Sequence, residues 1–399
     1  IFWADTIQSK ENDLPIKGQN EHSTLYKQKD SYLKSVFNMI MVNADSAKIM
    51  VDSAQNWIKK DEEVLYSKLL NIWGTYYWVK GELPLALDYY RKNLNYTQEN
   101  QLARDAMNAM SNLGALMNQM GMIDSAYYYL EEALVLSDQV NDEKLIAKIN
   151  FDLGNLYLRK DYKHLALEHL LKSISYYESC KDSMYLVYNY NSISNAYHNI
   201  GDFDKSKFYS KKAINIDLSR NDVNLLSNLY NNLGMSYWKL KHDYDTARYY
   251  INKAIENIPP VGNSIMYELV YKLNLGGVEC DDGNYKESFI ILSELNSYQF
   301  PYQDNYKISG MLINLGIAYQ YLDNLDSAIY YIDKGLALAE EVEAYDNMII
   351  GYQKRYQIDS IQGNFYQSLK YYQLLKISTD SIDSQKVRTK IAELEIIHE

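Results

Sequence analysis

The side chains of this sequence that could carry out chemistry are six histidines, two cysteines and many carboxylates. The histidines form no His-Glu-x-x-His pair, and there is no phosphate-binding glycine loop, Gly-x-Ser-x-Gly elbow or dinucleotide fingerprint. Cys180 and Cys280 are too far apart in sequence for a disulfide framework or a metal-ligand spacing. The sequence therefore predicts a protein that is not an enzyme and that has no metal site and no cofactor.

Asparagine is the side chain whose placement most suggests binding. Each asparagine offers a donor and an acceptor, so a row of them can hold the backbone of an extended peptide without requiring one peptide sequence. The alternative is that these asparagines are solvated residues on helix surfaces, although asparagine is a poor helix former. The predicted ligand-binding set consists of these asparagines, two tryptophans and a few cations: Asn71, Trp78, Asn118, Asn155, Arg159, Asn191, Asn195, His198, Asn228, Asn231, Trp238 and Lys239.

The charge and hydropathy of the chain narrow the kinds of partner. The formal net charge is −12, and no run of Lys and Arg is of the type that binds nucleic acid, so the phosphate backbone would be repelled. No apolar run approaches the roughly 18 residues that span a bilayer. We therefore expect a peptide or protein partner and no nucleic-acid partner.

A small residue recurs along the chain at intervals of about 40 residues. So many matches in one register indicate a repeat architecture. The nine positions are Ala47, Ala86, Ala126, Ala166, Ser206, Ala247, Ser288, Ala328 and Ser368.

The residues around each small residue follow one plan. About twelve residues earlier stands a Leu-Gly pair or its equivalent, ending at Gly316 in one unit, and an aromatic follows at Tyr319. A glycine such as Gly201 then permits the positive φ that ends a helix. An aspartate such as Asp326 precedes Ala328 by two residues and is predicted to cap the next helix. Each unit therefore reads as two antiparallel helices joined by a tight turn.

Tyrosine accounts for 41 of the 399 residues, and much of it follows the repeat. A ring in the same place in successive units is expected to pack between neighbouring units. Tyr128, Tyr249 and Tyr330 fall on the opposite side of the second helix, where we find no structural reason for them. The repeated ring, three residues after the small residue, is Tyr89, Tyr129, Tyr209, Tyr250, Tyr331 and Tyr371.

These motifs resemble the tetratricopeptide repeat family over about residues 22–378. The resemblance implies an all-α fold, a right-handed solenoid of about nine helix-turn-helix units with a period of 40 residues, longer than the family's common 34. In that family the first helices line a concave groove that often clamps peptides, and the asparagine set falls there. In the last three repeats the same positions predict an apolar surface made of Leu273, Cys280, Ile313, Ile317, Tyr321 and Ile350.

Residues 1–21 are predicted to be an N-terminal tail and residues 379–399 an exit helix that begins a coiled coil. Ile1–Ala4 is interpreted either as the remnant of a signal peptide or as an arbitrary boundary. In the exit helix Val387, Ile391, Leu394 and His398 follow a spacing of four, three and four. This spacing suggests a homodimer through the C-terminal helix.

The exit helix resembles a junction found in membrane-anchored sensor proteins of Bacteroidota-type bacteria. The resemblance implies a periplasmic sensor region whose membrane segment and output, a histidine kinase or a helix-turn-helix regulator, follow this chain. The alternative is a cytosolic scaffold or peptide-pheromone receptor of the same fold.

Overall fold

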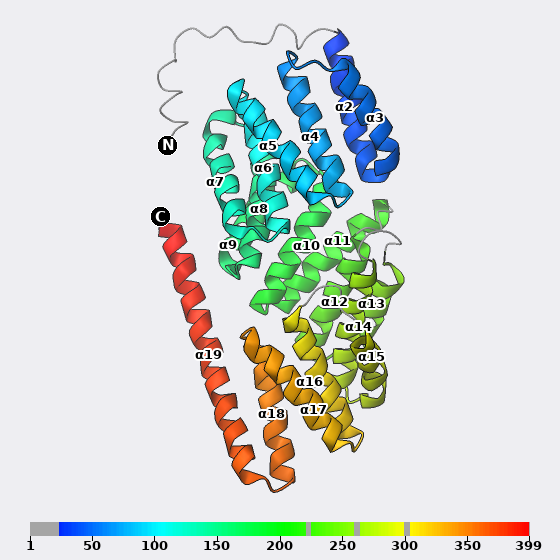
Figure 1. Cartoon of the computed structure of the whole chain (residues 1–399), viewed down its shortest axis with the longest axis vertical. Coiled ribbons are helices and arrows are strands. Elements are labelled where there is room, and N and C mark those ends of the chain that lie inside the picture. Colours follow the sequence, from blue (N-terminus) through cyan, green and yellow to red (C-terminus); the bar gives the residue numbers. More distant parts are fainter. Residues whose placement is uncertain (1–23, 221–224, 259–263, 299–303, 399) are drawn as a thin grey trace. The chain divides into compact units, whose positions relative to one another are not determined.

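The computed structural model describes residues 24–398 except 221–224, 259–263 and 299–303. Within these ranges it contains eighteen helices and no strand (Figure 1). The predicted tail, residues 1–21, lies outside them. The helices are α2 (Thr24–Val42), α3 (Ala44–Trp57), α4 (Glu63–Val79), α5 (Leu83–Glu99), α6 (Ala103–Gln119), α7 (Ile123–Val140), α8 (Glu143–Arg159), α9 (Lys163–Ser179), α10 (Ser183–Ile200), α11 (Phe203–Arg220), α12 (Leu226–Lys241), α13 (Tyr244–Glu256), α14 (Ser264–Asp281), α15 (Tyr285–Ser297), α16 (Asn305–Tyr321), α17 (Leu325–Glu341), α18 (Tyr345–Ile361) and α19 (Phe365–His398).

The helices form nine consecutive pairs, which confirms the predicted all-α repeat fold. We call the first helix of each pair the A helix (α2, α4 and so on to α18) and the second the B helix (α3 to α19). Contacts divide the chain within α8 into unit 1, Ile1–Leu156, and unit 2, Tyr157–Glu399.

The two helices of a pair cross closely at the glycine of the Leu-Gly motif. A Cβ atom on Gly316 would lie 2.9 Å from the carbonyl oxygen of Ala328 and 2.6 Å from Cγ1 of Ile332. Gly234 faces Ala247 in the same way. The small residues at both places are therefore needed for the two backbones to approach, as the sequence predicted.

The turns confirm the predicted glycines but not the predicted caps. Gly81, Gly121, Gly201, Gly283 and Gly363 all have φ between 75° and 89°, in the left-handed region.

The aspartates two residues before the small residues do not cap the helices by hydrogen bonding. They lie in the first helical turn, where a negative charge favours the helix dipole. The cap is the residue two places earlier: Asp243 accepts from the backbone N–H of Thr246, and Asn324 from that of Ser327.

The repeated tyrosine stacks on the helix A aromatic of its own unit, a contact that the sequence did not predict. It also packs against core clusters that include the preceding unit, as the sequence suggested: Tyr331 lies against the cluster with Leu292, and Tyr371 against the cluster with Ala328. Tyr250 lies 5.7 Å from Tyr237, ring centroid to ring centroid, at 13°, and Tyr331 lies 5.3 Å from Tyr319 at 4°. Offset stacking of this kind adds to the free energy of burial of the rings. In one unit His169 takes the tyrosine's place and stacks on Tyr157 at 5.3 Å.

His169 makes the stability of unit 2 depend on pH. Burial, aided by the Lys172 charge, lowers the pKa of His169 to about 4. As the pH falls from 6.5 towards 4, the unfolded chain therefore binds a proton that the folded chain does not, and stability is lost, by about 3 kcal/mol at the limit. We expect His169→Tyr to remove this loss, measured by urea unfolding followed by circular dichroism between pH 7.5 and 4.5.

The control for this prediction is His169→Phe, which also removes the imidazole but keeps a ring beside Tyr157. It should show the same reduced slope of unfolding free energy against pH as His169→Tyr. An equal slope in wild type and His169→Tyr would contradict the assignment.

Within each unit, neighbouring A helices lie closer together than neighbouring B helices. Contacts join α2 to α4 and α4 to α6 in unit 1, and α10 to α12, α12 to α14, α14 to α16 and α16 to α18 in unit 2. Among the described residues no comparable contact joins neighbouring B helices. The A helices therefore line the inner side of each unit.

The last helix runs without a break from Phe365 to His398. The predicted exit segment, residues 379–399, thus continues the B helix of the last repeat, and its start at 379 remains a prediction. The side chains of Val387, Ile391, Leu394 and His398 lie outside the described part of the chain.

Candidate ligand-binding face of the A helices

Asparagine pairs connect neighbouring A helices on the inner face. In unit 2, Nδ2 of Asn232 donates to Oδ1 of Asn191 at 3.0 Å, and Nδ2 of Asn274 donates to Oδ1 of Asn231 at 2.9 Å. In unit 1, Asn112 donates to Asn71 in the same way. The partners stand 41 or 43 residues apart, one residue more than the 40 or 42 residues that separate the Leu-Gly positions of the same two units. We call each pair a rung.

The two rungs of unit 2 use half of the hydrogen-bonding groups of their asparagines. Each bond takes the carbonyl oxygen of the first amide and one N–H of the second. The amide nitrogen of Asn191 and the oxygen of Asn232 have no further hydrogen-bond partner among the described residues. In the rung between Asn191 and Asn232, one donor group and one acceptor therefore remain for a ligand or water.

In unit 1 the rung between Asn71 and Asn112 extends to α8 through charged groups. Nζ of Lys148 donates to Oδ1 of Asn112 at 2.6 Å and to Oγ of Ser111 at 2.8 Å, and Ser111 donates to Asp152 at 3.1 Å. Burial raises the pKa of Asp152 to about 6 and lowers that of Lys148. The sequence analysis missed Asn112, Lys148 and Asp152, although the offset of repeat length plus one would have identified the rung.

The other predicted asparagines have several roles. Asn228 accepts from the hydroxyl of Tyr271 at 2.7 Å, and Asn155 donates to the carbonyl of Phe151 in its own helix at 3.0 Å. Asn118 is half-buried. Asn195 is half-buried and has no hydrogen-bond partner among the described residues, so its whole amide is available. Of the predicted set, Asn195 fits a ligand-binding role best.

The two tryptophans are held by contacts with the next A helix. Trp238 is buried, its Nε1 donates to Asp281 at 3.0 Å, and its ring covers Gly277 of α14. Nε1 of Trp78 donates to Oε1 of Gln119 at 2.5 Å. Trp238 therefore connects two A helices and exposes little of its ring to a ligand.

The predicted cations remain open to solvent or nearly so. Lys239 is exposed, with Nζ 3.7 Å from the ring centroid of Trp238, and the surrounding protein lowers its pKa. His198 is half-buried, and burial together with the Lys239 charge lowers its pKa to about 4. At neutral pH His198 is therefore uncharged beside a charged lysine. Arg159 is exposed.

The prediction of an apolar surface in the last three repeats is mostly wrong. Cys280, Ile313 and Ile317 are buried against one another between A helices, because there the inner positions of neighbouring helices meet. Burial raises the pKa of the Cys280 thiol to about 12, so the thiol is protonated. Leu273 is half-buried; Tyr321 and Ile350 are exposed, and Tyr321 stacks on Tyr285 at 3.8 Å.

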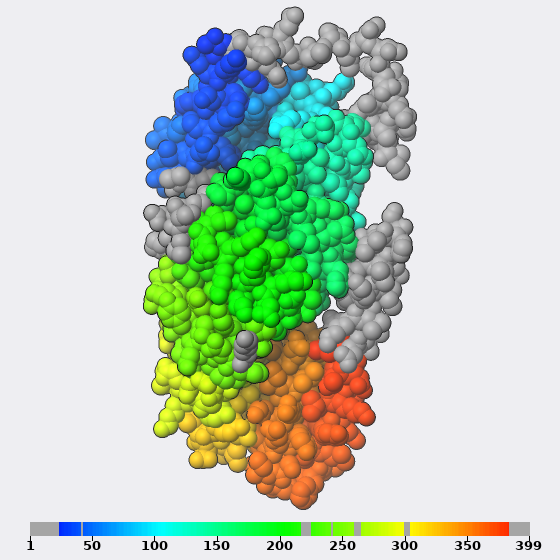
Figure 2. Space-filling model, turned by 180° about the vertical axis from the view of Figure 1, so that it is seen from behind, coloured from blue at the N-terminus to red at the C-terminus, as the bar shows by residue number. Residues whose placement is uncertain are grey.

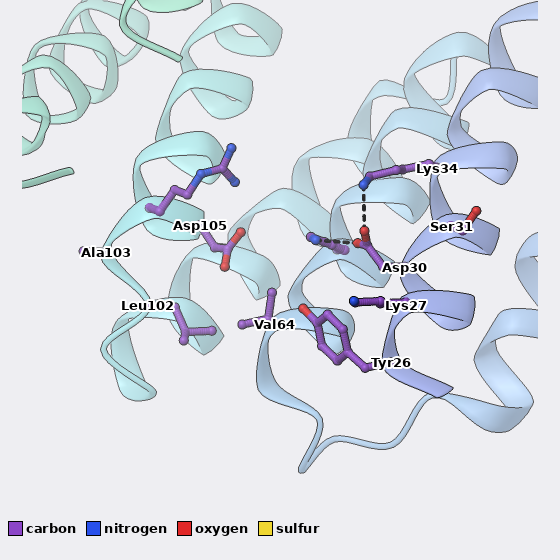
Figure 3. Close-up of a pocket in the computed structure, with 11 residues that line it drawn as sticks. Tyr26, Lys27, Asp30, Ser31, Lys34, Val64, Leu102, Ala103 and Asp105 are labelled. Atoms are coloured by element: carbon purple, nitrogen blue, oxygen red, sulfur yellow. Dashed lines mark hydrogen bonds and ion pairs between the residues drawn. The ribbon is translucent and has the colours of Figure 1, made fainter. Parts of the chain in front are cut away.

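Unit 1 contains a cavity of about 780 Å³ on the same face, between α2, α4 and α6 (Figure 3). Asp30 lines it from α2 and pairs with Lys34 at 2.7 Å and Lys68 at 2.6 Å. Burial opposes ionisation of Asp30, but the two lysines outweigh it and hold its pKa below the ordinary value. Tyr26 and Asp105 extend towards the same space.

A second cavity of about 370 Å³ shares Asp30, Lys34 and Lys68 with the first and reaches Asn71. Both volumes lie in the range of pockets that bind small ligands. The sequence analysis missed these cavities because repeat 1 lacks the Leu-Gly motif that located the inner face elsewhere.

In the described parts of the chain, no three His, Cys, Asp or Glu side chains converge on a position for a metal ion. No helix in the described residues is both long enough and apolar enough to span a bilayer.

Residues 187–220 match the family model of the tetratricopeptide repeat. No curated protein sequence matches the chain. Among solved structures, the apo form of the quorum sensor NprR from B. thuringiensis superposes with a TM-score of 0.65 at 14% identity, covering 89% of this chain and 99% of NprR.

Two further structures have the same fold. A Rap protein complexed with Competence and Sporulation Factor has a TM-score of 0.62 at 13% identity, covering 90% of this chain and 99% of that one. NprR in complex with its cognate peptide NprX has a TM-score of 0.55 at 14% identity, covering 88% of this chain and 98% of NprR. At such identities the similarity establishes the fold alone.

Proposed function

Because the chain contains a tetratricopeptide repeat and stacks the same helix pair along its length, we propose that it is a non-enzymatic binding protein. It holds a peptide or a partner protein on the inner face of its A helices. It does so as the sensor region of a bacterial signal-transduction or transcription-regulatory protein.

The observation that carries this proposal is the row of half-used asparagine amides in unit 2. Asn191 and Asn232 each keep an unused group, and Asn195 keeps both. An extended peptide backbone presents one N–H and one C=O per residue, which these amides complement without reading side chains. Lys239 adds a positive charge at the same face, which favours a ligand with a carboxylate near that end.

The structures of similar fold support a ligand of this class. NprR was crystallised with its cognate peptide NprX, and a Rap protein with Competence and Sporulation Factor. Their sequences differ too much from this one to transfer individual contact residues. The support they offer is that the same solenoid can hold a peptide.

For the signalling context, we propose that ligand binding changes the stacking of repeats. The conformational change is then transmitted along α19, including residues 379–399. Each repeat contacts only its neighbours, so a small change per repeat adds along the array. The proposed location is the periplasm, with a membrane segment after this chain. The alternative is a cytosolic scaffold or peptide-pheromone receptor, which the peptide complex of NprR favours.

The complete gene distinguishes the two contexts. The periplasmic sensor requires a signal peptide upstream and an apolar run of about 20 residues soon after Glu399. A gene without both would contradict the sensor and leave the cytosolic receptor.

The binding face is tested with a phage-displayed library of random heptapeptides selected on the full chain. The triple variant Asn191→Ala/Asn195→Ala/Asn232→Ala removes one complete rung and its free neighbour, so no rung partner is left unpaired. Three hydrogen bonds to the peptide are lost, each worth about 1 kcal/mol. The affinity for the selected peptides should therefore fall roughly a hundredfold, measured by isothermal titration calorimetry.

The matched control is Asn215→Ala/Asn252→Ala, which removes two exposed asparagines from the B helices α11 and α13 of the same repeats. It should bind as wild type does. Equal affinity of wild type and the triple variant, with both folded by circular dichroism, would refute the asparagine face.

A further inference from the structure

The last B helix, α19, has one side that no other described helix covers. In unit 2 each earlier B helix contacts the A helix that follows it: α9 contacts α10, α11 contacts α12, α13 contacts α14, α15 contacts α16 and α17 contacts α18. α19 packs on α18 through its buried side, which includes Ser368 and Ser378, and Tyr371 of that side also lies against a cluster with residues of α17. Figure 2 shows the first half of α19 at the solvent boundary beside α18.

The uncovered side of α19 is apolar. A contiguous exposed apolar patch on a folded protein normally marks a surface that associates with another molecule. Successive helical residues turn by 100°, which places five large apolar side chains of α19 within about 140° of one another. They are Phe365 (73% exposed), Tyr366 (81%), Leu369 (56%), Tyr372 (51%) and Ile377 (60%). We call them the open face of α19.

The charge of this region suits a second copy of the same chain. Residues 361–375 carry a single charge, that of Lys370, although the whole chain has a net charge of −12. Two copies would repel one another over most of their surface, and this neutral stretch is where they can meet. Lys376 and Asp380 lie in the same arc, and two-fold symmetry would bring unlike charges of this kind together from both copies.

The available area also fits a dimer. The three exposed aromatic rings, with Leu369 and Ile377, make a patch in the range of the largest on ordinary monomers, roughly 300–600 Å². This area is smaller than the roughly 800 Å² per partner of a standard interface, so we expect a dimer of moderate affinity.

We propose that the open face of α19 is the docking site for α19 of a second copy, giving a two-fold symmetric dimer. The inference goes beyond the peptide-binding function and does not depend on it, because the open face and the asparagine rungs share no residue. A dimer formed there would join the two copies through the helix by which we propose that the signal leaves.

The test is sedimentation equilibrium of the full chain at about 1–100 µM, the range in which moderate interfaces assemble. Wild type should fit a monomer–dimer equilibrium. Tyr366→Asp/Leu369→Asp places two charges in the interface and should weaken dimerisation at least about a hundredfold. Both side chains are more than half exposed, so the variant should fold.

The matched control is Tyr249→Asp/Tyr330→Asp, which makes the same charge change at similarly exposed tyrosines of α13 and α17. It should dimerise as wild type does, as should the Asn191→Ala/Asn195→Ala/Asn232→Ala variant. A wild-type chain that stays monomeric overturns the proposal. A Tyr366→Asp/Leu369→Asp variant that still dimerises also overturns it. A mass that rises above that of a dimer would indicate head-to-tail association and would overturn it as well.

Discussion

Gly316→Ala is expected to destabilise unit 2 by about 3 kcal/mol, although it adds one methyl group to a helix. The new Cβ would lie 2.6 Å from Cγ1 of Ile332, 2.9 Å from the carbonyl oxygen of Ala328 and 3.0 Å from the amide nitrogen of Ile332. Two of these three atoms belong to the backbone of α17 and cannot rotate away, so the helices α16 and α17 must separate. Separation also loosens the stack of Tyr319 on Tyr331. Urea unfolding followed by circular dichroism measures the loss.

Gly310→Ala is the control, because it makes the same change in the same helix. The nearest atoms to its Cβ are those of the Asn347 side chain, at 3.2 Å or more, so this side chain, which donates to Tyr306 and Ser309, needs to move by only a few tenths of an ångström and no backbone is displaced. Replacing a helical glycine by alanine gains up to about 1 kcal/mol of helix propensity, so Gly310→Ala should be neutral or stabilising. If the two variants lost the same stability, the close crossing of the helix pair would not be the cause.

Arg355→Met is expected to cost about 3–5 kcal/mol, the usual penalty for breaking a buried ion pair from one side. Arg355 is 7% exposed, and its Nε lies 2.8 Å from Asp333 of α17. Its Nη2 lies 3.5 Å from Asp359, which is 3% exposed, and its guanidinium lies 4.9 Å from the ring centroid of Tyr371 in α19. Methionine fills most of the volume but leaves the carboxylate of Asp359 buried without its cation.

The double variant Arg355→Met/Asp359→Leu distinguishes a lost charge from a lost shape. It removes both buried charges, and a buried pair replaced by apolar residues is often neutral in stability. Most of the loss should therefore be recovered, with thermal and urea unfolding as the readouts. A double variant as unstable as Arg355→Met would show that packing of Arg355 against Tyr371, not charge, holds the three helices together.

The sequence alone determined the helix pair, its number and its internal packing. These properties depend on residues about twelve positions apart within one unit, such as Gly316 with Ala328. Each is repeated in several units, so the pattern stands out from chance. The same repetition identified Tyr128, Tyr249 and Tyr330 as residues that packing does not use, and all three are more than half exposed.

The tertiary structure alone decided which inner-face residues remain available. Whether Asn231 meets a ligand or Asn274 depends on how one A helix is rotated and shifted against the next, which residue types within a unit do not encode. The same shift buries Trp238 and Cys280. A periodic sequence specifies the repeat unit. The geometry of stacking decides the contacts between units, and therefore which surface remains available for binding.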